Sequence, residues 1–201
     1  MNCDQVINFI KSFILLCMFF AVCLADKGLT GSIAPKWALK STTGEYVFLN
    51  DYVAPIGKDL RDGIKEQRSV IVQTFFATWC TNCINELSEL NRIKRLFSDD
   101  DVKFFIMDLT EYTRSLAGLK YQNIMNATEY LDDLGFNKIP VLMDDNGYTA
   151  LAYGYEGLND LTLPRLIIID KYQEVRFDET GACTKCFDED VIPLLQDLIN
   201  E

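Results

Sequence analysis

The chain has 201 residues, of which 49% are hydrophobic, so it is long enough to bury a sizeable core in one domain. Its formal net charge of −11 argues against nucleic acid or an anionic lipid surface as the main partner. The chain contains no histidine, which excludes histidine-ligated metal sites and every catalytic pair of serine or cysteine with histidine.

Residues 1–25 have the features of a secretory signal peptide. Lys11 precedes an apolar stretch from Phe13 to Ala25, which is short for a membrane-spanning helix and suits the hydrophobic region of a signal peptide. Cleavage is predicted after Ala25, which leaves residues 26–201 as the folded domain. The alternative is an uncleaved membrane anchor. Both readings predict an exported protein, which is periplasmic, secreted or in the lumen of the secretory pathway.

The seven cysteines divide into two groups. Three lie in the N-terminal segment, and the other four form two Cys-x-x-Cys pairs, Cys80/Cys83 and Cys183/Cys186. Paired cysteines in a chain with an export signal fit an oxidising compartment.

The predicted elements of the folded domain alternate between strands and helices. Apolar runs and hairpin signals predict strands at 37–40, 45–49, 70–76, 102–107, 140–144, 165–170 and 174–178. Helical spacing of apolar residues predicts helices at 87–97, 112–134, 148–153 and 191–199. Because Pro193 is tolerated only in the first turn of the last helix, residues 183–187 are predicted to form a loop or an isolated turn. This order predicts an α/β domain with a central mixed sheet, parallel at its centre and with an antiparallel hairpin at its edge.

The stretch from Ser69 to Glu86 organises the chain. Its apolar part, 70–76, is typical of a central strand that is covered on both faces. Cys80 follows where this strand ends and a helix begins, so a thiolate there faces unpaired backbone N–H groups and the positive end of the helix dipole. Both lower the thiol pKa, and Cys83 stands one helical turn behind to resolve a mixed disulfide. The alternatives are a structural disulfide or half of a zinc site, although zinc requires four ligands.

Residues 75–83, Phe-Phe-Ala-Thr-Trp-Cys-Thr-Asn-Cys, with Leu163-Pro164 before a long apolar strand, resemble the thioredoxin superfamily. The closer resemblance is to exported thiol-disulfide oxidoreductases of the TlpA/ResA type, over about residues 33–200. It rests on the N-terminal hairpin, on Glu86 just after the cysteines, and on a central insertion that runs up to the proline. The resemblance implies a thioredoxin-like fold with an N-terminal β-hairpin extension and this central insertion.

The resemblance also assigns roles to residues around the disulfide. Cys80 is the attacking cysteine and Cys83 is the resolving one. Pro164 is expected to be a cis-proline that faces the disulfide and exposes the backbone of Leu163 to a substrate strand. Trp79 is expected to cover the disulfide and to contact partners. The alternatives are a proline that merely starts a strand and a tryptophan that belongs to the core.

Glu86 is the candidate for handling the proton of the resolving cysteine. Thr74 occupies the position where classical thioredoxins carry a buried aspartate, and its hydroxyl cannot serve as that proton acceptor. Burial of Glu86 would raise its pKa and let it accept or relay the proton of Cys83. The alternative is an ordinary acidic residue that the helix dipole stabilises.

The second cysteine pair follows Gly181-Ala182, which resembles the Gly-Ala turn that lies beside the active site in thioredoxins. This likeness brings Cys183 and Cys186 near the first pair, where they would form a second redox couple. The alternative is a structural disulfide that holds the loop before the last helix. The sequence leaves both hypotheses open.

These features predict a thiol-disulfide oxidoreductase of an exported compartment, with a role in redox homeostasis and antioxidant protection. It needs no cofactor and no metal. The expected partners are proteins with thiols or disulfides and a redox partner protein, and the membrane is a partner only through an uncleaved N-terminal segment. The dipeptide between Cys80 and Cys83 matches neither the Gly-Pro of reductants nor the Pro-His of strong oxidants, so the direction of electron flow is open.

Two other functions are the alternatives. A thiol peroxidase of the peroxiredoxin type would require threonine at position 77 and proline at position 73, where this chain has Ala77 and Gln73. A redox-inert binding or metal-delivery domain is the non-enzymatic alternative, but copper chaperones on this fold use a histidine, which this chain lacks.

Overall fold

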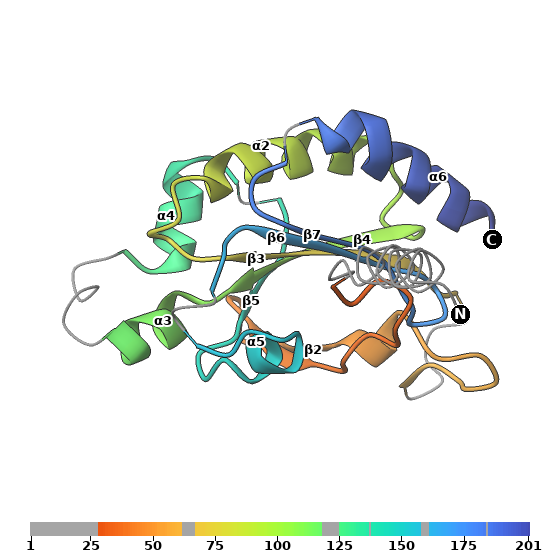
Figure 1. The fold of residues 1–201 in the computed structure, drawn as a ribbon, viewed down its shortest axis with the longest axis horizontal. Helices are drawn as coiled ribbons and strands as arrows, with labels where there is room; N and C mark the ends of the chain where they lie inside the picture. The colour runs from red at the N-terminus through yellow and green to blue at the C-terminus, as the bar shows by residue number, and fades with distance from the viewer. Residues whose placement is uncertain (1–27, 62–66, 118–124, 137, 158–160, 184) are drawn as a thin grey trace, which may run out of the picture.

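The computed structural model describes residues 28–61, 67–117, 125–136, 138–157, 161–183 and 185–201. The predicted signal peptide lies outside the described residues. The described part of the chain forms one seven-stranded sheet with helices on both faces (Figure 1). The predicted α/β architecture is therefore confirmed.

The strands form a mixed sheet with the order β2-β1-β5-β4-β3-β6-β7. β3, β4 and β5 run parallel to one another, whereas β1, β2, β6 and β7 have antiparallel neighbours. The sheet is thus parallel at its centre, and the predicted N-terminal hairpin forms one edge. The strands are β1 (Ala38–Ser41), β2 (Tyr46–Phe48), β3 (Val70–Phe76), β4 (Val102–Asp108), β5 (Val141–Met143), β6 (Arg165–Ile169) and β7 (Val175–Thr180).

The helices are divided between the two faces of the sheet. α2 and α6 lie along one face, and α5 lies on the other (Figure 1). The α-helices are α2 (Cys83–Ile93), α3 (Thr110–Ala117), α4 (Ala127–Asp133), α5 (Tyr148–Ala152) and α6 (Ile192–Asn200). Shorter helical turns are η1 (Leu49–Asp51), η3 (Lys94–Leu96) and the π-helical turn η5 (Phe187–Val191). No helix within the described ranges is long and apolar enough to cross a membrane.

The central strand β3 is buried along its whole length, as its apolar pattern predicts. Its two polar side chains point to opposite faces, because successive residues of a strand alternate. Gln73 Oε1 accepts a hydrogen bond from Trp37 Nε1 at 2.9 Å, which ties the strand to the N-terminal segment. Thr74 donates to Glu86 of α2 on the other face. Each buried polar group therefore links the strand to the element that covers it.

One predicted helix is in fact two helices. The sequence pattern predicts helix from 112 to 134, but the structure has α3 and α4 as separate elements. Asn126 adopts an extended conformation and caps α4 by accepting a hydrogen bond from Glu129 N at 2.9 Å. A side chain of this type satisfies a free N–H at a helix start, which favours a new helix over a continuous one.

The C-terminal helix α6 begins close to its predicted start, but an unpredicted helical turn precedes it. The prediction of a loop over 183–187 was wrong for Cys186 and Phe187, which are helical and lead into the turn η5. In this turn the Ile192 N–H donates to Phe187 O, five residues earlier, which is the π-helical pattern. A proline inside an α-helix lacks the backbone N–H that would donate to the residue four positions earlier. Pro193 stands just after the wider π-helical turn, in the first turn of α6.

Candidate active site

Cys80 and Cys83 form a disulfide in the turn between β3 and α2, with their Cα atoms 5.4 Å apart. The Cys80 N–H donates to Ala77 O at 2.9 Å, and the Cys83 N–H donates to Cys80 O at 3.1 Å. α2 itself begins at Cys83, so Cys80 lies in the turn that precedes the helix. Cys80 is 5% exposed and Cys83 is 1% exposed, which makes Cys80 the more accessible of the two.

The peptide bond between Leu163 and Pro164 is cis, as predicted. β3 and β6 are antiparallel, and Phe75 pairs with Arg165, so the carboxyl end of β3 lies beside the amino end of β6. The disulfide turn leaves the sheet at the first of these ends, and Pro164 enters the sheet at the second. The fold therefore brings the two predicted features to the same end of the sheet.

Glu86 follows Cys83 by one turn of α2, so the two side chains share a face of the helix. Glu86 is 1% exposed, and its Oε1 accepts a hydrogen bond from the Thr74 hydroxyl. Its other oxygen, Oε2, has no hydrogen-bond partner within the described residues. Burial raises the pKa of this carboxyl to about 7, although the bond from Thr74 lowers it in part. Glu86 is therefore buried, and its carboxyl lies against the strand position that carries the aspartate in classical thioredoxins.

The two residues before the disulfide are held by the start of α3. The Thr78 N–H donates to Thr110 Oγ1 at 3.0 Å, and Trp79 Nε1 donates to Thr113 Oγ1 at 2.9 Å. The Thr110 hydroxyl donates in turn to Asp108 Oδ1 at 2.5 Å. Because its proton is committed to Asp108, the Thr110 oxygen remains free to accept from Thr78. A buried polar network thus fixes the entry to the disulfide turn.

A buried ion pair supports the chain next to the cis-proline. Arg165 follows Pro164 directly and binds both carboxylate oxygens of Asp178, with N–O distances of 2.7 Å. Its third nitrogen donates to Tyr153 O at 2.6 Å, and Asp178 also accepts from Leu29 N at 2.7 Å. The two charged side chains are only 10% and 2% exposed. A bidentate pair in this setting restricts the orientation of both groups, so it fixes the backbone beside the proline.

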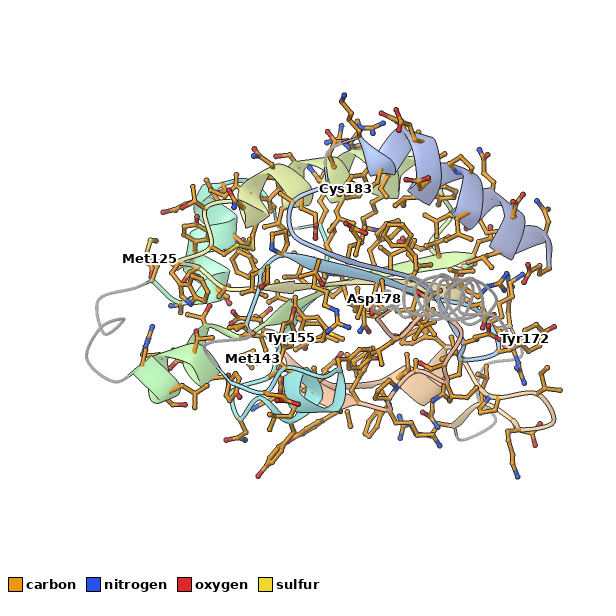
Figure 2. All side chains as sticks on the ribbon, viewed as in Figure 1. Met125, Met143, Tyr155, Tyr172, Asp178 and Cys183 are labelled. Carbon is orange, nitrogen blue, oxygen red and sulfur yellow. A yellow bond between two sulfur atoms is a disulfide. The ribbon has the colours of Figure 1, made fainter. Side chains whose placement is uncertain are left out.

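Cys183 and Cys186 form a second disulfide, with their Cα atoms 5.7 Å apart. Two residues earlier, Gly181 has a φ of +94° and donates its N–H to Pro164 O at 2.7 Å. The predicted Gly-Ala turn therefore lies against the cis-proline. Cys183 lies on the side of the sheet that carries α2 and α6, whereas Tyr155 lies on the opposite side (Figure 2).

The polar groups that support the site were not predicted from the sequence. Arg165 is the one cation in a predicted apolar strand, and Asp178 lies in the strand predicted to follow it, so opposite charges in neighbouring strands were the available signal. Asp108 and Thr110 have the spacing of a local cap at a strand end. That spacing signals a turn, but it does not reveal that the turn binds Thr78.

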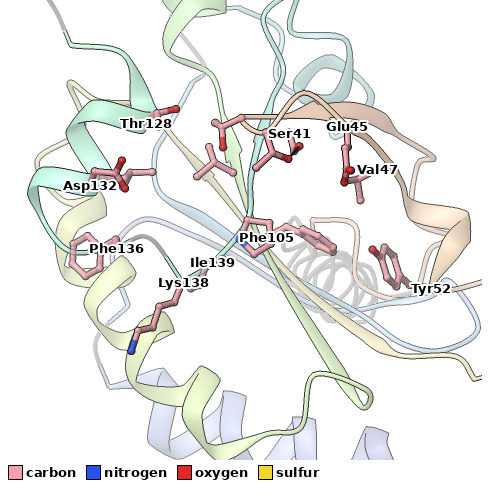
Figure 3. A pocket seen from close by; sticks show the side chains of 15 residues that line it. Ser41, Glu45, Val47, Tyr52, Phe105, Thr128, Asp132, Phe136, Lys138 and Ile139 are labelled. Atoms are coloured by element: carbon pink, nitrogen blue, oxygen red, sulfur yellow. Dashed lines mark hydrogen bonds between the residues drawn. The ribbon is translucent and has the colours of Figure 1, made fainter.

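A cavity of about 380 Å³ opens between the hairpin turn, α4 and the start of β5 (Figure 3). Thr42, Leu131 and Pro140 are among the residues that line it, and neither cysteine pair contributes to it. The cavity is therefore separate from the redox site. Among the described residues, no group of three or more cysteine, aspartate or glutamate side chains could hold a metal ion.

The fold and the site together define a class of protein. A Cys-x-x-Cys disulfide between a central strand and a helix, with a cis-proline at the same end of the sheet, is the arrangement of a thioredoxin-like protein. The chain belongs to the Redoxin family, whose model matches residues 32–191. This match confirms the predicted membership of the thioredoxin superfamily and supports an oxidoreductase activity. No curated protein matches the chain in sequence.

Several solved structures have the same fold as this chain. A protein described as the thiol:disulfide interchange protein DsbE of Chlorobium tepidum is 20% identical, with a TM-score of 0.60 over 85% of this chain and 96% of that one. StoA of Bacillus subtilis is 15% identical, with a TM-score of 0.53 over 84% and 98% of the two chains. The exposed lipoprotein thioredoxin Etrx1 of Streptococcus pneumoniae is 18% identical, with a TM-score of 0.54 over 82% and 100%. At these identities the likeness shows the shared fold.

Proposed function

We propose that this protein is a thiol-disulfide oxidoreductase that acts on disulfides of exported proteins through Cys80 and Cys83. The observation that carries the proposal is the disulfide itself, which joins Cys80 in the turn after β3 to Cys83, the first residue of α2 and one helical turn before the buried Glu86. In this arrangement Cys80 is the more exposed of the two cysteines, and Glu86 supplies a group that can take up a proton.

The order of the reaction steps follows from the exposure of the two cysteines, because Cys80 is the more exposed one. In the reduced protein, the Cys80 thiolate attacks one sulfur of a substrate disulfide and forms a mixed disulfide, and the other substrate sulfur leaves as a thiolate. Cys83 then loses its proton and attacks the Cys80 sulfur, which releases the second substrate thiol and re-forms the Cys80–Cys83 bond. Two electrons pass from the dithiol to the substrate. The same steps run backwards when the oxidised protein meets a substrate dithiol.

Glu86 is the proposed acceptor of the Cys83 proton. It lies one helical turn from that cysteine. Burial raises its pKa to about 7, so the carboxylate can take up a proton near neutral pH. Its unpartnered Oε2 leaves one carboxyl oxygen available for the proton. The Thr74 hydroxyl occupies the other oxygen and orients the group.

Substrate contact is proposed for Trp79 and for the backbone of Leu163. Trp79 is half-buried beside the disulfide, with its indole N–H fixed on Thr113, so its ring is held rather than mobile. Leu163 precedes the cis-proline at the same end of the sheet as Cys80. An extended substrate segment laid along this backbone would bring its disulfide to Cys80.

We also propose an exported location, with residues 1–25 as a signal peptide or anchor. Four cysteines of the folded domain are placed for two disulfides, and paired cysteines of this kind are typical of chains in oxidising compartments. One protein of similar fold is an exposed lipoprotein thioredoxin, which supports the same location.

A redox titration tests the proposed function. The wild-type protein is equilibrated in buffers of increasing ratio of reduced to oxidised dithiothreitol, trapped by alkylation, and mapped by peptide mass. Cys80 and Cys83 are expected to convert together in one reversible two-electron step, with an unchanged circular dichroism spectrum. A pair that stays oxidised until the protein unfolds would refute the proposal.

A further inference from the structure

The two disulfides follow strands that end at the same edge of the sheet. Phe75 of β3 pairs with Arg165 of β6, which pairs in turn with Thr180 of β7. The chain that follows β3 and the chain that follows β7 therefore leave the sheet at the same end. The first carries Cys80, and the second carries Cys183, three residues after Thr180.

The helices that follow the two pairs are also joined. Arg92 near the end of α2 forms an ion pair with Asp188 of η5, with an N–O distance of 2.9 Å. Cys186 is part of the same buried apolar cluster as Cys80 and Cys83. The helical segment that follows the second pair therefore contacts the redox helix α2.

The two sulfurs of the second pair differ in accessibility. Cys183 is half-buried, whereas Cys186 is 7% exposed and begins the C-terminal helical segment. The Cys186 N–H points at Cys183 Sγ, with an N–S distance of 3.1 Å. A backbone N–H in this position stabilises a thiolate on Cys183. Cys183 therefore carries both the more exposed sulfur of the pair and the one whose thiolate is stabilised.

The disulfide contributes little that the surrounding structure does not already provide. It joins residues three apart, and closing so short a loop removes little conformational entropy from the unfolded chain. Phe187 and Val191, directly after it, are fully buried, and Asp188 is tied to α2 by Arg92. The helical segment is thus anchored mainly by the packing of Phe187 and Val191, and opening of the bond leaves this packing in place.

We propose that Cys183–Cys186 is a second redox-active couple of this chain, which exchanges with dithiols and disulfides through the sulfur of Cys183. An incoming thiolate attacks Cys183 Sγ, the Cys183–Cys186 bond breaks, and Cys186 leaves as a thiolate that takes up a proton. The second thiol of the donor then displaces Cys183, so that two electrons pass from the donor dithiol to the pair. The donor class is a dithiol, either an external one or the reduced form of Cys80 and Cys83.

The test removes the first couple so that the second is observed alone. A Cys80→Ser, Cys83→Ser double variant is equilibrated in dithiothreitol redox buffers, alkylated and mapped by peptide mass, with circular dichroism as the measure of folding. Cys183 and Cys186 are expected to convert together and reversibly while the spectrum is unchanged. The same peptides are followed in the wild-type protein, so the result does not depend on the stability of the variant. A pair that stays oxidised until the fold is lost overturns the proposal.

Two further variants in this background identify the exchanging sulfur. Cys186→Ser leaves Cys183 as the single thiol of the pair, and Cys183→Ser leaves Cys186. With glutathione disulfide as the probe, Cys183 is expected to form the mixed disulfide at least about tenfold faster than Cys186, because burial restricts access to the latter. Equal rates, or a faster reaction at Cys186, would overturn the assignment to Cys183. Neither outcome depends on the activity of Cys80 and Cys83, so the proposed function is tested separately.

Discussion

Replacing Cys80 with serine is expected to reduce the rate of insulin-disulfide reduction by dithiothreitol to that of dithiothreitol alone. A hydroxyl at this position is a far weaker nucleophile than a thiolate and cannot form the mixed disulfide. The loss covers the whole protein-dependent rate, because Cys83 is 1% exposed and cannot replace Cys80 as the attacking sulfur. The measurement is the turbidity of precipitating insulin chains with time.

A matched control separates this chemical effect from a general disturbance of the helix. Ser88→Ala lies on the exposed face of α2 and removes only a hydroxyl that donates to Ile84 O at 3.0 Å. Its rate is expected to equal that of the wild-type protein. Equal rates for wild type and Cys80→Ser would contradict the enzymatic account and leave a binding domain.

Replacing Glu86 with glutamine is expected to remove a pH dependence of stability. The folded state raises the pKa of Glu86 from an ordinary 4.5 to about 7, so between these values the folded chain binds more protons than the unfolded chain. The free energy of unfolding therefore falls as pH rises from about 4.5 to about 7, by about 3 kcal/mol in the wild-type protein. Glutamine has no proton to lose and can still accept the hydrogen bond from Thr74. Above pH 7 the variant is expected to be the more stable protein.

Urea denaturation at a series of pH values measures this difference. Glu89→Gln is the matched control, because Glu89 is on the same helix but pairs with Arg92 at the surface. Its free energy of unfolding is expected to change by less than about 1 kcal/mol at every pH. Parallel curves for wild type and Glu86→Gln would mean that the carboxyl of Glu86 is not the titrating group.

The proposed proton transfer also predicts a pH dependence of the reactivity of Cys83. In the reduced protein, the rate of alkylation of Cys83 is expected to follow the ionisation of Glu86, with an inflection near its pKa of about 7. Glu86→Gln is expected to abolish this inflection. An unchanged pH profile would assign Glu86 a purely structural position.

The sequence predicted the features whose signals are local. A continuous apolar run marks β3, and the strand-turn-helix pattern locates Cys80 and Cys83 between two elements. The resemblance to a known family supplied what local patterns could not, namely the cis conformation at Pro164 and the burial of Glu86.

The polar support of the site was not predictable in the same way. Thr78 and Thr110 are far apart in the chain, and their contact depends on the parallel pairing of β3 with β4. Arg165 and Asp178 meet only because β6 and β7 pair in a particular register. Neither contact leaves a periodic trace in the sequence, because each is a single pair of side chains rather than a repeated pattern.

The helical turn η5 before the last helix was missed for a different reason. Pro193 is a strong signal for the first turn of an α-helix, and the prediction followed it. Pro193 does lie in the first turn of α6, but a π-helical turn precedes it. Such turns are rare, so the sequence pattern does not predict one.

The most direct test of the central claim is the capture of a substrate on Cys80. The reduced Cys83→Ser variant is mixed with insulin, alkylated, and mapped by peptide mass under conditions that preserve disulfides. Without its resolving partner, Cys80 is expected to retain the substrate as a mixed disulfide that the wild-type protein releases. The account predicts that the captured insulin chain is bonded to Cys80. Absence of any adduct at Cys80, with the protein folded and reduced, would contradict it.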